Sequence, residues 1–231
     1  MPATREQHGH PARAAVPVAV VGAGPGIGAA TARRFAAAGH PVAVVGRNRG
    51  RLDALVAEIE AAGGRAQAFT ADIADRAATE AAFAGIRAAL GDPGVLVFNA
   101  FVPALGLPSE VDPALFAAQL SANVTGALVC VQQVIPAMRA AGHGTLLLTG
   151  GGLALDPYPE YAPLAVSKAG QRNLFQSLAK ELAPAGIHVA MLTVCGIVAP
   201  GTRFAAELMA EQHWQLHAQP AGAWETEIVV R

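Results

Sequence analysis

A glycine-rich stretch, residues 22–28, has the residue types and spacing of a loop that binds phosphate. It follows the apolar run 18–21 and leads into an alanine-rich helical pattern. Side chains in this stretch would keep backbone N–H groups from closing on a pyrophosphate, whose charge the positive end of a helix dipole favours. The spacing predicts a strand, a dinucleotide-binding loop and a helix N-terminus. The predicted contact residues are Gly22, Gly24, Gly26, Ile27 and Gly28.

The residues after the second apolar run, 42–45, bear on which dinucleotide is bound. An acidic side chain there would accept hydrogen bonds from the adenosine ribose 2′-hydroxyl. This chain has Gly46 and then Arg47. A carboxylate would repel a 2′-phosphate, whereas glycine leaves room and arginine offers a planar fork of donors. We therefore expect NADP(H), and the alternative is that Arg47 is a solvated surface arginine.

The order of the next motifs resembles that of the short-chain dehydrogenase/reductase family, over residues 16–200. The matches are Asp72-Ile73, Asn99-Ala100, Asn123 and Ser167-Lys168-Ala169. The resemblance implies that Asp72 and Ile73 contact the adenine, and that Asn99 with Ala100 lines the adenosine ribose and the nicotinamide side. It also implies that Asn123 kinks a helix in the catalytic relay and that Lys168 binds the nicotinamide ribose. Ile197 and Thr202 fall where the family contacts the nicotinamide or its phosphates.

Two positions depart from the family pattern. The family has a tyrosine four residues before the lysine, where the ammonium lowers the phenol pKa for proton exchange with a carbonyl or alcohol. This chain has Leu164 there. The family serine lies about thirteen residues before the tyrosine, and the matching residue is Gly151. Asn123 and Lys168 are thus kept, and both groups that would touch the reacting oxygen are absent.

Three hypotheses about proton transfer remain open. In the first, Tyr161, at the loop that enters the helix through Pro163, supplies a substitute phenol; the alternative is that it only packs with Tyr158. In the second, hydride transfer to an imine or activated alkene proceeds with a proton from water or substrate. In the third, the protein binds NADP(H) without redox chemistry, as a sensor or assembly subunit.

Histidine and cysteine offer weaker candidates. His213 and His217 lie four residues apart, but no third ligand is tied to them by spacing, so we expect no metal site and a polar surface. Alternatively, Trp214 makes their helix a hydrophobic lid over the substrate. Cys130 and Cys195 lie in apolar runs and are expected to be free thiols with packing roles.

Strands alternate regularly with helices along the rest of the chain, and these elements must position the residues named above. We predict the α/β class, with a Rossmann-type doubly wound seven-stranded parallel sheet and helices on both faces. In such sheets ligands bind at the carboxyl ends of the strands. The helices are predicted at 26–38, 49–62, 74–90, 113–141, 163–182 and 203–219, and the strands at 18–21, 41–45, 66–70, 94–98, 145–149, 187–194 and 225–230.

Length and composition favour one domain. The 231 residues, 53% of them hydrophobic, suffice for one core, and the net charge of −1 gives no reason to expect a nucleic acid or an anionic membrane as partner. Residues 1–15 are expected to be a flexible tail and 16–231 one domain with a short C-terminal lid. No run reaches the 18 to 20 apolar residues of a membrane span, so we expect a cytoplasmic protein that binds a small molecule. The apolar helices 113–141 and 163–182 predict a homodimer or homotetramer.

Overall fold

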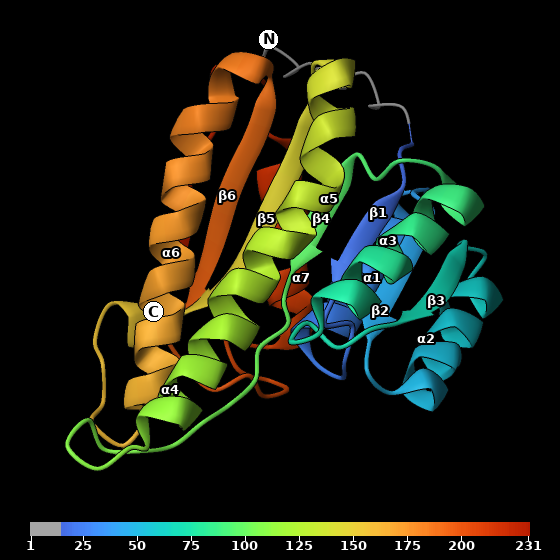
Figure 1. Cartoon of the computed structure of the whole chain (residues 1–231). Helices are drawn as coiled ribbons and strands as arrows, with labels where there is room; N and C mark the ends of the chain where they lie inside the picture. The colour runs from blue at the N-terminus through green and yellow to red at the C-terminus, as the bar shows by residue number, and fades with distance from the viewer. Residues whose placement is uncertain (1–14) are drawn as a thin grey trace, which may run out of the picture.

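Seven parallel strands form one sheet in the computed structural model, which describes residues 15–231 (Figure 1). The strand order is β3-β2-β1-β4-β5-β6-β7, so the chain starts in the middle of the sheet and winds outward in both directions. This is the doubly wound α/β fold that the alternating pattern predicted. The strands are β1 (Val18–Val21), β2 (Val42–Gly46), β3 (Ala66–Thr70), β4 (Val95–Phe98), β5 (Gly144–Gly151), β6 (Ile187–Val194) and β7 (Glu227–Val230).

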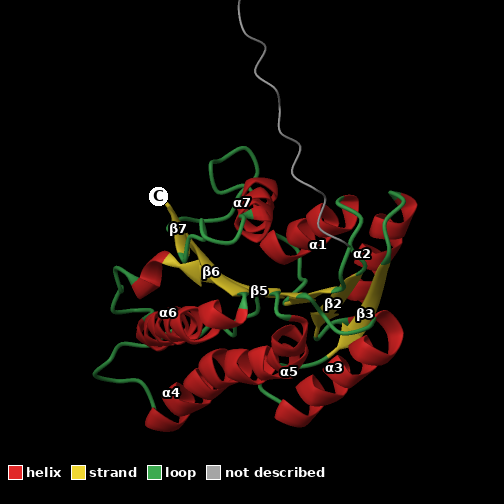
Figure 2. Ribbon diagram, turned by 90° about the horizontal axis from the view of Figure 1, so that it is seen from above, coloured by secondary structure: helices red, strands yellow, loops and turns green. Residues whose placement is uncertain are grey.

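Helices cover both faces of the sheet, as Figure 2 shows from above. On one face lie α1, α2 and α7, and on the other lie α3, α5 and α6, with α4 at one end. The central strands are buried on both sides and therefore read as unbroken apolar runs. The helices are α1 (Ile27–Ala37), α2 (Arg49–Ala61), α3 (Arg76–Leu90), α4 (Pro113–Leu120), α5 (Gly126–Ala141), α6 (Ala162–Leu182) and α7 (Ala206–Ala218).

Side chains of β1 alternate between two cores. Val18 and Val20 pack with Phe35 of α1, whereas Ala19 and Val21 pack in the cluster that holds Phe175 of α6. This alternation follows from the two-residue period of a strand. The two cores fix α1 and α6 against opposite faces of the strands that end at the predicted binding site.

Some element boundaries differ from those predicted. Strand β5 runs on through Gly150 and Gly151, which pair in register with Thr193 and Val194 of β6. Helix α3 begins at Arg76, because Asp75 caps it by accepting from the N–H of Ala78. The helix predicted over 113–141 is broken into α4 and α5 by a π-helical turn, Ser121–Thr125.

The stretch Pro113–Ala141 corrects one sequence expectation. The sequence was expected to hold no stretch able to span a membrane. By length and composition, however, this helical stretch is long and apolar enough to do so. In the fold Val131, Val134 and Met138 of α5 pack into the core beneath the sheet. The stretch therefore fits a core helix.

Helix α7 does not have the surroundings that were predicted for it. His213 and His217 are buried, so the prediction of a polar surface is wrong. Trp214 packs edge-on against Phe35 of α1, with ring centroids 5.4 Å apart, which places it in the helical layer behind the sheet. No residue of α7 lines the larger cavity at the carboxyl ends of the strands, so α7 is not a lid over it; the C-terminal part of the described chain lines this cavity through residues 194–198, Arg203 and Arg231. The tail predicted at 1–15 lies, except for residue 15, outside the described residues.

Candidate functional site

Two adjoining cavities lie at the carboxyl ends of the strands. The smaller, of about 280 Å³, lies beside the glycine loop and the end of β2. The larger, of about 1240 Å³, lies over the end of β5. Pro25, Asn99 and Phe101 line both, so the two form one continuous cleft. A cleft at this edge of a doubly wound sheet is the usual place for a ligand.

Two glycines of the loop are required by close backbone contacts. Gly22 has a φ of +86°, and a Cβ on it would lie 2.5 Å from the backbone nitrogen of Ala100. A Cβ on Gly28 would overlap the carbonyl oxygen of Gly22, which already accepts a hydrogen bond from Asn99 Nδ2 at 2.8 Å. Asn99 thus holds the loop in shape from the end of β4.

The other two glycines form an open cradle. A Cβ on Gly24 or Gly26 would meet no atom within 4 Å, so these positions present bare backbone. Helix α1 also starts without a side-chain cap, whereas Asn48 and Asp75 cap α2 and α3. Uncapped N–H groups at a helix start favour an anion. The residues present therefore fit a pyrophosphate. Ile27, the first residue of α1, lines the larger cavity.

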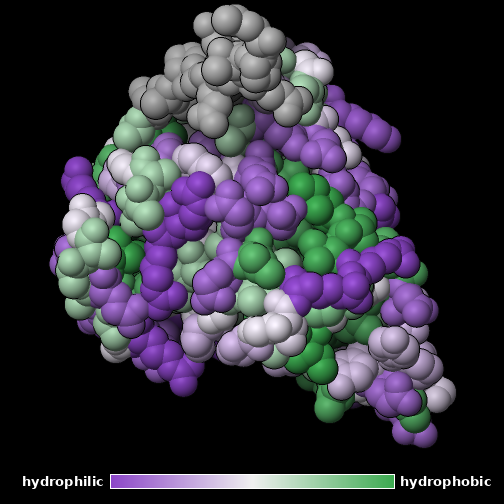
Figure 3. Space-filling view, turned by 180° about the vertical axis from the view of Figure 1, so that it is seen from behind, coloured by the Kyte–Doolittle hydropathy of each residue, from purple (hydrophilic) through white to green (hydrophobic). Residues whose placement is uncertain are grey.

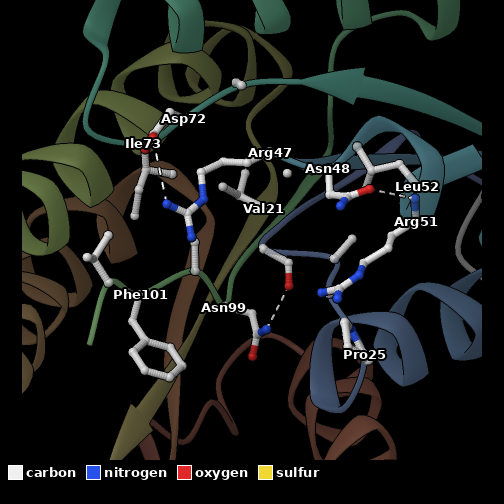
Figure 4. A pocket seen from close by; sticks show the side chains of 17 residues that line it. Val21, Pro25, Arg47, Asn48, Arg51, Leu52, Asp72, Ile73, Asn99 and Phe101 are labelled. Carbon is white, nitrogen blue, oxygen red and sulfur yellow. Dashed lines mark hydrogen bonds and ion pairs between the residues drawn. The ribbon is translucent and has the colours of Figure 1, made fainter. Parts of the chain in front are cut away.

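The smaller cavity carries two arginines at the end of β2 (Figure 4). Arg47 lies 3.8 Å from the carboxylate of Asp72, an exposed pair of small energetic value. Arg51 is the third residue of α2 and points toward the cavity. Arg51 was not predicted from the sequence, because its place at the cavity depends on how α2 follows the loop after β2. Asp72, Ile73 and Ala100 also line this cavity, and their contacts with the adenosine remain a prediction.

Lys168 is the buried cation of the larger cavity. Its Nζ donates to the carbonyl oxygen of Thr149 at 3.1 Å and lies 5.3 Å from the ring centroid of Phe101. Within residues 15–231 it forms no ion pair. Burial without a partner charge lowers the pKa of Lys168 to about 8.

Leu164, Gly151 and Tyr161 surround this lysine in the same cavity. A Cβ on Gly151 would lie 3.8 Å from Cε of Lys168, so the glycine leaves space where a side chain would fit. Tyr161 stands immediately before α6, in the entering loop as predicted, and is half-exposed. No hydrogen bond joins its hydroxyl to Lys168 in the described part of the chain.

Asn123 lies behind the cavity and is fully engaged with backbone. Its Oδ1 accepts from the N–H of Val102 at 2.7 Å, and its Nδ2 donates to the carbonyl of Val102 at 3.0 Å. The π-helical turn frees its own carbonyl, which accepts from Gln171 Nε2 at 2.9 Å. Asn123 lies within the π-helical turn that separates α4 from α5, and it lines neither cavity. Gln171 was not foreseen, because its role depends on the crossing of α6 with the π turn.

The segment after β6 is only partly at the site. Ile197 is exposed at the rim of the larger cavity, which Cys195 also lines. Thr202 instead donates to the carbonyl of Ala199 and accepts from the N–H of Phe204, and it lines neither cavity.

Cys130 is buried in the core, where burial raises its pKa to about 12. No cluster of three or more potential metal ligands occurs among residues 15–231.

Hydrophobic side chains gather on one half of the face shown in Figure 3. The rim of the larger cavity is similarly apolar, since Phe101, Tyr158 and Ile197 are all exposed there. The larger cavity thus combines these apolar side chains with one buried ammonium group, that of Lys168, and with the exposed charged groups of Asp156, Arg203 and Arg231.

Comparison with known proteins agrees with this geometry. The family model described as short chain dehydrogenase matches residues 17–213. The 2,3-dihydro-2,3-dihydroxybenzoate dehydrogenase of Bacillus subtilis is 32% identical over 204 residues, which cover 88% of this chain and 74% of that protein. A crystal structure of a short-chain dehydrogenase from Rhodopseudomonas palustris is 34% identical, with a TM-score of 0.85 and coverage of 94% of this chain and 98% of that one.

A crystal structure of a metagenomic short-chain oxidoreductase in complex with NADP is also similar. It is 29% identical, with a TM-score of 0.86, and the match covers 94% of this chain and 96% of that one. The fold, the glycine cradle and these matches together identify the protein as a member of the short-chain dehydrogenase family, an NAD(P)-dependent short-chain oxidoreductase.

Proposed function

We propose that the protein is an NADP(H)-dependent oxidoreductase that transfers a hydride to or from a small carbonyl, imine or activated alkene at an altered proton-transfer site. One observation carries the proposal: the open glycine cradle, two arginines and Lys168 line a single continuous cleft. The cradle would hold the pyrophosphate, and Lys168 would bind the nicotinamide ribose. When bound, the nicotinamide supplies or accepts the hydride.

The arginines support the preference for NADP(H). Arg47 and Arg51 flank the end of β2, where Gly46 leaves room for a 2′-phosphate. Hydrogen bonds between charged groups each contribute about 1.5–3 kcal/mol, which is a tenfold or greater preference per contact. Asp72 faces the same cavity, but its carboxylate lies beside Arg47, which offsets its charge. A similar short-chain oxidoreductase was crystallised with NADP.

The proposed alteration rests on the surroundings of Lys168. Leu164 offers no hydroxyl one turn before the lysine, and Gly151 offers none across from it. Tyr161 is the phenol at this cavity that lies nearest in sequence to Lys168. The same two positions favour a second candidate function, a non-catalytic NADP(H)-binding protein that serves as a sensor or assembly subunit.

The test has two stages. Fluorescence titration should show NADPH binding at least tenfold more tightly than NADH, and equal or reversed affinities would refute the NADP(H) preference. Loss of NADPH absorbance is then followed with ketones, imines and enones. Oxidation with any class supports the enzyme, whereas tight binding without oxidation across the panel supports the non-catalytic candidate.

We also propose a homodimer or homotetramer formed through the stretch Pro113–Ala141 and helix α6. Leu115 of α4 and Val166 of α6 are exposed apolar side chains on these elements. A monomer in sedimentation at micromolar concentration would refute this.

A further inference from the structure

We propose that Lys168 itself donates the proton that completes reduction of a carbonyl or imine substrate, in place of a tyrosine. This inference rests on the proposed oxidoreductase function and goes beyond it, because it assigns the acid. The lysine is the one buried cation at the larger cavity in the described part of the chain.

The placement of its ammonium group carries the proposal. Nζ has three N–H donors, and Thr149 takes one of them through its carbonyl. Phe101 lies over the group on one side and provides only a ring face. The donors that remain can point into the cavity that the side chain lines.

Space for a reacting oxygen exists beside this group. Gly151 has extended backbone, and a Cβ there would only reach ordinary contact distance from the lysine side chain. Leu164 lies one helical turn before Lys168 and presents an apolar surface. A substrate oxygen or nitrogen can therefore approach Nζ without first displacing a hydroxyl.

The charge environment leaves the ammonium able to release a proton. No ion pair or hydrogen bond joins Lys168 to another titratable group in residues 15–231. With burial as the cause, the pKa of about 8 makes the group mostly protonated at neutral pH and a stronger acid than a free lysine. The other titratable side chains at this cavity are Asp156, Tyr158, Tyr161, Cys195, Arg203 and Arg231.

The step balances with groups already named. The substrate carbon would receive two electrons and one proton, as hydride, from a reduced nicotinamide bound in the cleft. The electron pair of the C=O or C=N bond moves to the oxygen or nitrogen, which forms a bond to a proton of Lys168 Nζ as that N–H bond breaks. The neutral amine then takes a proton from water.

The sequence allows a direct measurement, because Lys168 and Lys180 are its only lysines. Lysine labelled with ¹³C at Cε gives two signals in the full-length protein, and the exposed Lys180 on the same helix is the reference. We expect the Lys168 signal to titrate near pH 8, without and with NADPH. Titration at or above pH 10 would overturn the proposal without touching cofactor binding.

Variants separate the acid from the cofactor contact. Lys168→Arg keeps a cation but removes a group that titrates near pH 8. We expect its kcat to fall at least 100-fold, within the range for lost general acid catalysis, with NADPH affinity changed less than tenfold. Lys168→Ala should recover activity when small alkylammonium ions are added. Lys180→Arg is the matched control and should leave kcat unchanged.

The outcomes distinguish the two proposals. Absence of turnover in the wild type, with NADPH bound, refutes the oxidoreductase function and this inference with it. Turnover that survives Lys168→Arg overturns this inference alone and assigns the proton to water or to Tyr161. Loss of that turnover in Tyr161→Phe would then assign it to Tyr161.

Discussion

At the scale of the residue, one lysine and the two positions beside it determine the chemistry available in the larger cavity. Lys168 is buried without an ion pair in the described chain, and Leu164 and Gly151 leave it without hydroxyl neighbours at the two positions that face it. A Cβ on Gly151 would meet the Lys168 side chain at ordinary contact distance, and the Leu164 side chain borders the cavity. Both positions face the larger cavity, so larger side chains at them can extend into it.

We predict that Gly151→Ser with Leu164→Tyr introduces a second proton donor. The double variant should reduce simple ketones at least tenfold faster than the wild type, because a phenol next to an ammonium is an effective acid. Rates of NADPH oxidation across pH 6–10 measure this, and the single variants are the controls. Unchanged rates and an unchanged pH profile, in a variant that folds and binds NADPH, would show that these positions do not limit proton transfer.

At the scale of the element, the glycine loop combines two kinds of glycine. Gly22 and Gly28 allow close backbone contacts, whereas Gly24 and Gly26 keep the cradle open. The sequence predicted that all four glycines belong to a dinucleotide-binding loop, because their spacing can be read from one short segment. It did not predict which glycines make close contacts and which stay open, since those contacts involve Ala100 and Asn99 at the end of β4.

We predict that two alanine substitutions in this loop affect different properties, one the stability of the fold and the other the affinity for NADPH. Gly28→Ala should destabilise the fold by several kcal/mol, because its Cβ overlaps the backbone of Gly22. Gly24→Ala should change the unfolding free energy by less than about 1 kcal/mol and still weaken NADPH binding at least tenfold. Thermal unfolding and fluorescence titration measure the two effects. Full NADPH affinity in Gly24→Ala would show that the phosphate does not lie over this residue.

Features that depend on contacts between elements distant in the sequence were not predicted. Arg47 was found because it follows a strand directly, but Arg51 depends on the rotation of α2. Gly150 and Gly151 have low strand propensity, and β5 includes them because β6 extends alongside. His213 and His217 were assigned to the surface, because the contact between α7 and α1 joins segments about 180 residues apart.

At the scale of the whole molecule, a buried polar chain connects the two faces of the sheet. Thr31 of α1 lies 3.1 Å from His213 Nδ1, and His213 Nε2 lies 3.4 Å from the hydroxyl of Thr149. The carbonyl of Thr149 then accepts from Lys168 on the other face. Burial lowers the pKa of His213 to about 4, so the imidazole is neutral at pH 7.

We predict that His213 makes the fold acid-sensitive. The unfolded chain binds a proton at this histidine below its ordinary pKa of about 6.5, whereas the folded protein does not until about pH 4. Stability is therefore lost as pH falls through this window, by about 2 kcal/mol at pH 5. Urea unfolding at pH 7 and pH 5 measures the loss. His213→Gln should remove it and the exposed His143→Gln should not, and equal losses in both variants would contradict the assignment.

The central claim is that one cleft holds NADP(H) along the glycine loop, with its nicotinamide beside Lys168. A crystal structure of the full chain with NADPH tests this most directly. We predict that the 2′-phosphate lies within hydrogen-bond distance of Arg47 or Arg51, the pyrophosphate over Gly24 and Gly26, and the nicotinamide ribose against Lys168. A 2′-phosphate directed away from both arginines, or a nicotinamide outside the larger cavity, would contradict the account.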